Sequence, residues 1–183
     1  MRKIMVFLSA VLMAVSMAAC SGGGDNAETA VSGYLDALKA YDLEKSNSYL
    51  VEGDEAYNML AESGEEIKEE EKIVMKYLSY AIKGSEENGD TAVVTVDITN
   101  VNMQDVLKAY MAEGLAAAFE NPEMTEEEMM QMLVDAFEAN KDNTVTTTVD
   151  INLTKADGSW KVQTDDALFS ALMGGMSADL FNQ

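Results

Sequence analysis

The chain contains no histidine, one cysteine and one proline among its 183 residues. Histidine is the commonest general base and the commonest metal ligand in proteins, so its absence removes both uses. A Ser-His-Asp or Cys-His catalytic mechanism is therefore excluded. The chemistry available to the chain rests on carboxylates, tyrosines, lysines and hydroxyl groups.

Basic residues are also scarce, because 12 Lys and Arg stand against 33 Asp and Glu and give a net charge of −21. An acidic surface repels the phosphate backbone of nucleic acids and the headgroups of anionic lipids. We therefore expect no nucleic-acid partner. Any attachment to a membrane must come from a covalent lipid rather than from a basic patch.

An uncharged apolar run, Ile4 to Met17, follows Arg2 and Lys3 at the N-terminus. The run is shorter than the roughly twenty residues that a membrane-spanning helix needs. Its length and its positive flank are typical of a secretory signal peptide. The small residues that follow it lead directly to Cys20.

The residues Met17-Ala18-Ala19-Cys20 resemble the lipobox read by lipoprotein signal peptidase, whose usual pattern is Leu-Ala-Gly/Ala-Cys. Met17 departs from that pattern at the Leu position. The resemblance implies that residues 1–19 are removed and that Cys20 is acylated, as with palmitate. Each buried methylene contributes about 0.8 kcal/mol, so more than one acyl chain gives stable anchoring. The alternative is a free cysteine after an uncleaved apolar anchor.

The rest of the chain divides into a tether, one domain and a tail. Residues 20–27 contain the lipidated cysteine and a Gly/Ser stretch, a composition that favours a flexible linker. Residues 28–176 form the predicted domain, and residues 177–183 are predicted to be loose. Removal of Arg2 and Lys3 with the signal peptide takes the net charge from −21 to −23.

Helical periodicity opens the domain, with one apolar face formed by Val31, Tyr34, Leu35, Leu38 and Tyr41. Asp25 with Glu28 predicts a capping box at its start, and Asp42 predicts the N-cap of a second helix. A third helix is expected over about residues 54–62. The acidic run at residues 65–72 is expected to be a solvated helix face or loop.

Four alternating runs then predict two β-hairpins. Residues 78–83 and 91–99 flank Asn88-Gly89, and residues 144–154 and 160–162 flank Asp157-Gly158. Such dipeptides favour tight hairpin turns. A last short helix, capped by Thr164 or Asp165, is expected to contain Leu168, Phe169 and Leu172 and to end at Gly174-Gly175.

Between Asn102 and Asn140 the period is helical again. One predicted helix has apolar residues at Val106, Leu107, Tyr110, Met111, Leu115 and Phe119. After Asn121-Pro122, a capping box at Thr125 starts another helix with a buried face of Met129, Met130, Leu133, Ala136 and Phe137. The predicted fold is α+β: N-terminal helices packed on a curved, cone-like, four-stranded antiparallel sheet, with an inserted helical hairpin.

Residues 34–45, from Tyr34-Leu35-Asp36 to Leu43-Glu44-Lys45, resemble the first two helices of nuclear-transport-factor-like domains. The same cystatin-like cone occurs in bacterial lipoproteins of unknown function, and residues 155–162 are similar to their closing hairpin. The resemblance covers most of residues 28–175. It implies a pocket between sheet and helices, which the insertion at residues 102–140 covers or narrows.

Some members of this fold are isomerases or dehydratases that use an Asp base with Tyr or His donors. Tyr34, Tyr41, Tyr80 and Asp97 are residues of these types. However, Tyr34 and Tyr41 lie on the packing stripe of a helix, and alternation places Asp97 opposite the apolar face of its strand. We therefore predict no catalytic residue and no enzymatic activity.

The residues Met129-Met130-Gln131-Met132 are similar to the methionine clusters of copper-handling exported proteins, and thioethers suit Cu(I). Helical spacing already explains Met129 and Met130 as packing residues. The abundant carboxylates would allow calcium, but no Asp-x-Asp-x-Asp-Gly loop occurs. We predict no metal and no cofactor, and the sequence identifies no ligand-binding residue.

The predicted function is that of a lipid-anchored extracytoplasmic lipoprotein that binds a small apolar ligand, a peptide or a protein partner without catalysis. The alternatives are a structural or accessory surface lipoprotein without a ligand, and an isomerase-like or dehydratase-like enzyme. A ligand binder should contain an apolar cavity, whereas an interaction protein should have a filled core and an exposed apolar patch. The acidic composition and the lack of histidine favour a Gram-positive surface over an outer membrane.

Overall fold

The computed structural model describes residues 26–54, 72–121 and 123–177. Several predictions lie outside these residues: the signal peptide, Cys20 and most of the tether, Asp25, most of the helix at residues 54–62, most of the acidic run at residues 65–72, Pro122, and the tail from residue 178. No helix of the described ranges is long and apolar enough to cross a membrane.

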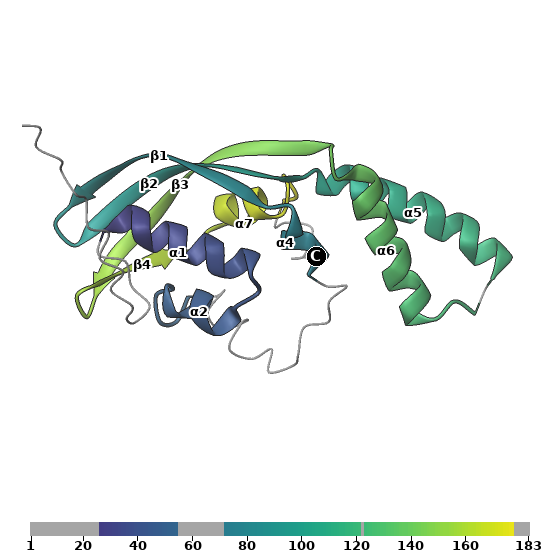
Figure 1. Ribbon diagram of the computed structural model, residues 1–183, viewed down its shortest axis with the longest axis horizontal. Coiled ribbons are helices and arrows are strands. Elements are labelled where there is room, and N and C mark those ends of the chain that lie inside the picture. The colour runs from purple at the N-terminus through teal and green to yellow at the C-terminus, as the bar shows by residue number, and fades with distance from the viewer. Residues whose placement is uncertain (1–25, 55–71, 122, 178–183) are drawn as a thin grey trace, which may run out of the picture.

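A four-stranded antiparallel sheet forms the centre of the molecule and confirms the two predicted hairpins. Its strands follow the order of the sequence: β1 (Ser79–Asn88), β2 (Thr91–Val101), β3 (Thr144–Ala156) and β4 (Ser159–Gln163). The turns fall where Asn-Gly and Asp-Gly predict them, with positive φ at Gly89 (64°), Asp157 (52°) and Gly158 (80°). The sheet is curved and does not close into a barrel (Figure 1).

Helices cover one face of the sheet: α1 (Ala27–Lys39), α2 (Leu43–Ser48), the short α4 (Ile73–Lys76) and α7 (Asp166–Leu172) (Figure 1). The predicted alternation of the strands is confirmed, because every second residue of β2, and of β3 from Val149 to Leu153, is buried against these helices. The largest side chains of this core are buried almost completely: Trp160, Leu35, Ile98, Ile151, Leu153 and Leu168. The α+β architecture is therefore as predicted.

The cap predicted for α1 needs correction. The N-cap of α1 is Asn26, whose Oδ1 accepts a hydrogen bond from the Thr29 amide at 2.8 Å. Asn26 therefore caps this helix in place of the predicted Asp25, and Glu28 accepts a hydrogen bond from Ser85 of β1 at 2.8 Å. At α7, one of the two predicted candidates is confirmed as the cap, since Asp165 Oδ1 accepts a hydrogen bond from the Leu168 amide.

The other predicted caps are confirmed. Asp42 caps α2 by accepting a hydrogen bond from the Lys45 amide at 3.0 Å. Thr125 and Glu128 form a complete capping box at the start of α6. Short polar side chains at these positions satisfy amides that the first turn of a helix leaves without a partner.

The predicted helical hairpin consists of α5 (Met103–Glu120) and α6 (Glu126–Asn140), and it projects beyond the end of the sheet where β2 stops and β3 begins (Figure 1). Its base packs on α4 and on the end of α7 through a second apolar cluster, which contains Ile73, Val101, Met103, Val106, Ala136, Phe137 and Met176. The prediction that Met129 is a buried residue is wrong, because 37 % of its surface is exposed.

Candidate functional site

The outer side of α5 carries an exposed apolar surface. Met111, Leu115 and Phe119 are 70 %, 64 % and 82 % exposed. We call these three residues, together with the exposed alanines 112, 116 and 118, the α5 surface. Together with Met129 of α6, these are all the exposed large hydrophobic side chains of the residues that the structure describes. Exposed large apolar side chains of the described residues therefore gather on the α5–α6 hairpin, and such clustering marks interaction sites.

The spacing of these residues explains why they form one surface. Met111, Leu115 and Phe119 are four residues apart, so they lie one above another along the same side of the helix. From Ala109 to Phe119 the only charged residue is Glu113. A neighbouring side of α5 faces α6, since a methyl group at Gly114 would lie 3.8 Å from Met132 Cε. A helix that is apolar on both sides normally has a partner on both sides, and α6 provides one of them.

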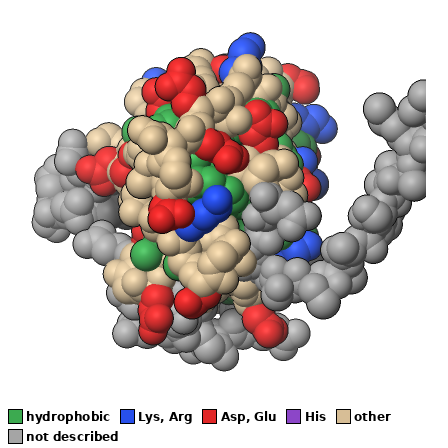
Figure 2. Space-filling model, turned by 90° about the vertical axis from the view of Figure 1, so that its left-hand side faces the viewer, with side chains coloured by type: hydrophobic (Ala, Val, Ile, Leu, Met, Phe, Trp, Pro, Cys, Tyr) green, Lys and Arg blue, Asp and Glu red, His purple; other side chains and the backbone are tan. Residues whose placement is uncertain are grey.

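The rest of the hairpin is strongly acidic. Residues 103–140 contain one lysine, Lys108, and nine acidic residues: Asp105, Glu113, Glu120, Glu123, Glu126, Glu127, Glu128, Asp135 and Glu138. Lys108 pairs with Asp105 at 2.8 Å, so it does not offset the other carboxylates. At the end of the molecule opposite the hairpin, acidic side chains are scattered among polar ones, with only small apolar areas between them (Figure 2).

Polar contacts fix the base of the hairpin. Glu138 Oε1 accepts hydrogen bonds from Lys76 Nζ and from the Tyr77 hydroxyl, both at 2.6 Å. The Lys76 hydrogen bond, with that of Tyr77, lowers the pKa of Glu138 to about 2. On the other side of the base, Asn102 caps α5. The base is thus tied to α4 and Tyr77, while the α5 surface lies further out.

This ion pair leads to a prediction about acid stability. A carboxylate with a lowered pKa stabilises the folded chain above its ordinary pKa near 4.5, and this contribution is lost as the pH falls toward 2. We expect Glu138→Gln to make stability less sensitive to pH between about 4.5 and 2, as followed by urea unfolding at several pH values. Glu127→Gln removes an equal charge from an exposed position, and equal pH slopes in the two variants would contradict the prediction.

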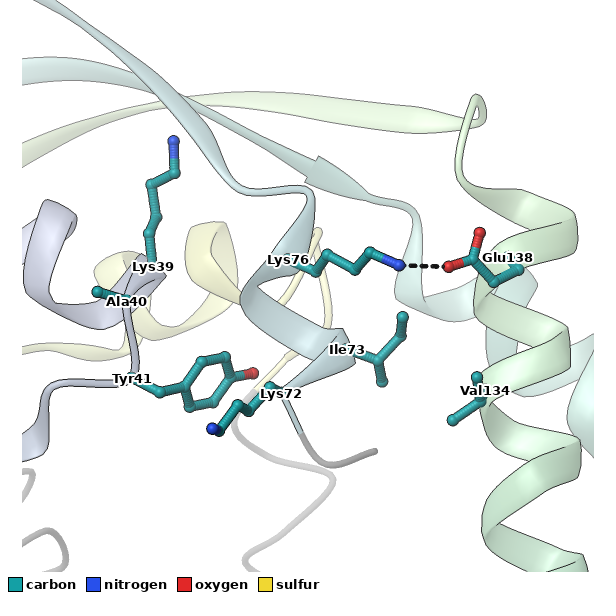
Figure 3. Close-up of a pocket in the computed structure, with 8 residues that line it drawn as sticks. All are labelled: Lys39, Ala40, Tyr41, Lys72, Ile73, Lys76, Val134 and Glu138. Carbon is teal, nitrogen blue, oxygen red and sulfur yellow. Dashed lines mark hydrogen bonds and ion pairs between the residues drawn. The ribbon is translucent and has the colours of Figure 1, made fainter. Parts of the chain in front are cut away.

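A hollow of about 680 Å³ lies between the end of α1, α4 and α6. Its lining is mixed, with three lysines and one carboxylate among Lys39, Ala40, Tyr41, Lys72, Ile73, Lys76, Val134 and Glu138 (Figure 3). Lys76 reaches across one side to Glu138, and Lys39 points away from the other lining residues (Figure 3). The hollow is open, its lining is mixed and its lining residues come from the end of α1, α4 and α6, so it is not the pocket between sheet and helices that the resemblance implied.

The four residues considered for catalysis lie apart. Tyr34 is buried in the core, where burial, with the nearby Asp54, raises its pKa. Tyr41 Oη accepts a hydrogen bond from the Met75 amide at 2.9 Å. Tyr80 donates to Asp36 Oδ1 at 2.9 Å, and burial raises its pKa, with the Asp36 hydrogen bond as a further cause. Asp97 lies on the opposite face of the sheet.

Asp97 is occupied by contacts within that outer face. It accepts a hydrogen bond from Thr148 Oγ1 at 2.6 Å and pairs with Lys83 at 3.1 Å; these hydrogen bonds lower its pKa. The prediction that alternation places it opposite Val94, Val96 and Ile98 is confirmed. The structure therefore brings Tyr80 to Asp36 and does not bring Asp97 to any of the three tyrosines. In the described ranges, no three His, Cys, Asp or Glu side chains are grouped to hold a metal ion.

The α5 surface was not identified as a site from the sequence, although a feature of the sequence could have indicated it. That feature is the run from Ala109 to Phe119, in which a predicted helix carries a single charged residue, Glu113. Periodicity alone placed Met111, Leu115 and Phe119 on a helix, but it could not say whether another element of the chain covers them.

Comparisons with known proteins place the chain in a family. In a search of solved structures, the chain is similar to the crystal structure of ycdA, a candidate lipoprotein of Bacillus subtilis subsp. subtilis str. 168, with 17 % identity and a TM-score of 0.41. The match covers 80 % of this chain and 46 % of that one, so this chain spans less than half of the matched protein. No curated protein matches. The sequence profile described as "Domain of unknown function (DUF5105)" matches residues 23–176, and the chain belongs to this family.

Proposed function

We propose that the chain is a lipid-anchored extracytoplasmic lipoprotein, on a Gram-positive surface, that binds another protein through the α5 surface and performs no catalysis. The observation that carries this proposal is the placement of the exposed large hydrophobic side chains. Those of the described residues all lie on the α5–α6 hairpin. Solvent-exposed apolar surface of this kind is costly to maintain unless a partner covers it.

The packing between sheet and helices supports an interaction protein over a binder of a small apolar ligand. Side chains of α1, α7 and all four strands meet there, and Trp160, Leu35 and Ile98 are at most 1 % exposed. A small ligand would need space where these side chains lie. The α1 helix on a curved sheet also supports the resemblance to nuclear-transport-factor-like domains, which we retain as part of the proposal.

The proposed anchor depends on Cys20. We expect Cys20→Ser to move the protein from the membrane fraction to the soluble fraction or the medium, because serine offers no thiol for acylation. Cell fractionation and mass spectrometry of the N-terminal peptide measure this. A Cys20→Ser protein that stays in the membrane with the mass of the parent would refute the anchor.

The proposed interaction can be tested by site-specific photo-crosslinking in the producing cell. A photoreactive amino acid at position 115 is expected to give an adduct of one discrete mass, because the Leu115 side chain is 64 % exposed within the proposed contact. Position 86, an exposed glutamate on β1, is the control. Adducts at position 115 no stronger than those at position 86 would rule out an interaction through this surface.

A further inference from the structure

We infer that the segment bound by the α5 surface is a cationic amphipathic helix of another protein; this inference rests on the proposed function and names the chemistry of its partner. The surface offers an apolar row on a hairpin rich in carboxylates, and the occupant must complement both features.

The apolar row fits a helix laid along α5. Met111 to Phe119 span two helical turns, about 12 Å at 1.5 Å per residue. A partner helix with apolar residues three and four apart presents a row of matching period, the mode by which amphipathic helices fill apolar grooves. Residues 103–132 contain six methionines: Met103, Met111, Met124, Met129, Met130 and Met132. Flexible methionine side chains can adjust their conformation to the side chains of a partner helix.

The charges select a cationic partner. Glu113 and Glu120 lie on α5 itself, and Glu126, Glu127 and Glu128 form the first turn of α6. Lysines and arginines beside the apolar row of a partner helix would meet these carboxylates, and opposite potentials speed association and favour the correct partner. A second copy of this chain would bring like charges together. An anionic membrane would be repelled in the same way.

The test uses the processed full chain in vesicles of neutral phosphatidylcholine and a fluorescent synthetic peptide of leucine and lysine whose leucines repeat every three and four residues. Fluorescence anisotropy reports binding. We expect binding that weakens at least tenfold when the same composition is rearranged to remove the apolar face. A similar loss is expected when glutamate replaces lysine in the peptide.

Variants of the chain test whether the α5 surface is the site. Leu115→Gln with Phe119→Gln is expected to weaken peptide binding at least tenfold, and both positions are exposed enough to accept glutamine without unfolding. Val93→Gln on the outer face of the sheet is the matched control and should bind as the parent does. Glu120→Gln with Glu127→Gln should weaken binding and reduce its dependence on salt, whereas Glu44→Gln with Glu86→Gln should not.

Four outcomes would overturn the inference: no binding of the amphipathic cationic peptide, equal binding of the rearranged peptide, dimerisation through this surface seen by light scattering, or insertion of the hairpin into the vesicles. Failure of the inference is distinct from failure of the proposed function. A discrete crosslink at position 115 without peptide binding rejects only the cationic helix, whereas absence of that crosslink rejects the interaction itself.

Discussion

Replacing Gly174 with alanine is expected to lower the free energy of unfolding by about 3 kcal/mol, because it forces two parts of the backbone apart. Gly174 has a φ of +56°, and an added Cβ would lie 1.8 Å from the carbonyl oxygen of Val101 and 3.2 Å from the Met103 nitrogen. Backbone atoms cannot rotate away as a flexible side chain does. The turn after α7 must therefore move off the junction between β2 and α5.

Two separate costs contribute to this expectation. A left-handed backbone conformation costs an L-residue about 1–2 kcal/mol. Forcing extra atoms into a packed site costs typically another 1–3 kcal/mol. Because Gly174 also accepts a hydrogen bond from the Met103 amide at 3.4 Å, displacement of the turn weakens the attachment of the hairpin base as well.

Gly158→Ala separates these costs. Gly158 has a φ of +80°, and nothing lies within 4 Å of the position of an added Cβ. This variant should lose only the backbone contribution, about 1–2 kcal/mol. Urea unfolding followed by the fluorescence of Trp160, the single tryptophan, measures both variants. If Gly174→Ala were no more destabilising than Gly158→Ala, the close approach to Val101 would be refuted.

The sheet could be predicted from the sequence because local patterns determine it. Alternation in residues 91–99 and 144–154 identifies which face is buried, and Asn88-Gly89 and Asp157-Gly158 supply the left-handed conformations that tight turns need. A register shift by one residue would expose every buried valine and isoleucine. The alternating pattern and the turn residues together therefore determine one register for each pair of strands.

Helix caps were predictable only where one candidate stood at the start of the apolar pattern. Asp42 and Thr125 had no competing neighbour, whereas Asp25 and Asn26 are adjacent, as are Thr164 and Asp165. The choice at α1 also involves a distant contact, because the Glu28 carboxylate accepts a hydrogen bond from Ser85, 57 residues further along the chain. Local sequence does not contain such a contact.

The α5 surface was harder to predict from the sequence than the sheet or the helix caps. The apolar residues of α5 follow the same spacing whether their outer side is buried or exposed, so Val106 and Phe119 look alike in the sequence. In the structure Val106 is fully buried in the second cluster and Phe119 is 82 % exposed. The difference arises from the position of each residue along a hairpin that extends beyond the sheet, and only the tertiary arrangement determines that position.

Asn100→Ala is the second substitution with a large expected effect, because the Asn100 side chain joins three elements inside the protein. It is 1 % exposed and lies near the end of β2. Its Nδ2 donates to the carbonyl oxygens of Val74 at 3.0 Å and Leu172 at 2.7 Å, which belong to α4 and α7. Its Oδ1 accepts from the Val101 amide at 2.8 Å.

Alanine would leave these buried groups without a partner, and each unsatisfied group costs about 1–3 kcal/mol. We therefore expect Asn100→Ala to lower the free energy of unfolding by about 3–5 kcal/mol. That is a large part of the 5–15 kcal/mol typical of a domain. The exposed Asn152 on β3 is the matched control, and Asn152→Ala should change stability by less than about 0.5 kcal/mol.

Asn100→Asp tests whether donation to the two carbonyl groups is the important contact. An ionised aspartate cannot donate to either carbonyl, and burial raises the pKa of such a carboxyl. A raised pKa means that stability is lost as the pH rises above the ordinary value near 3.9, so the deficit relative to the parent should widen between about pH 4 and pH 7. A loss of unfolding free energy that does not depend on pH would contradict this prediction. It would show that packing at Asn100, rather than its hydrogen bonds, holds α4 and α7 against the base of the hairpin.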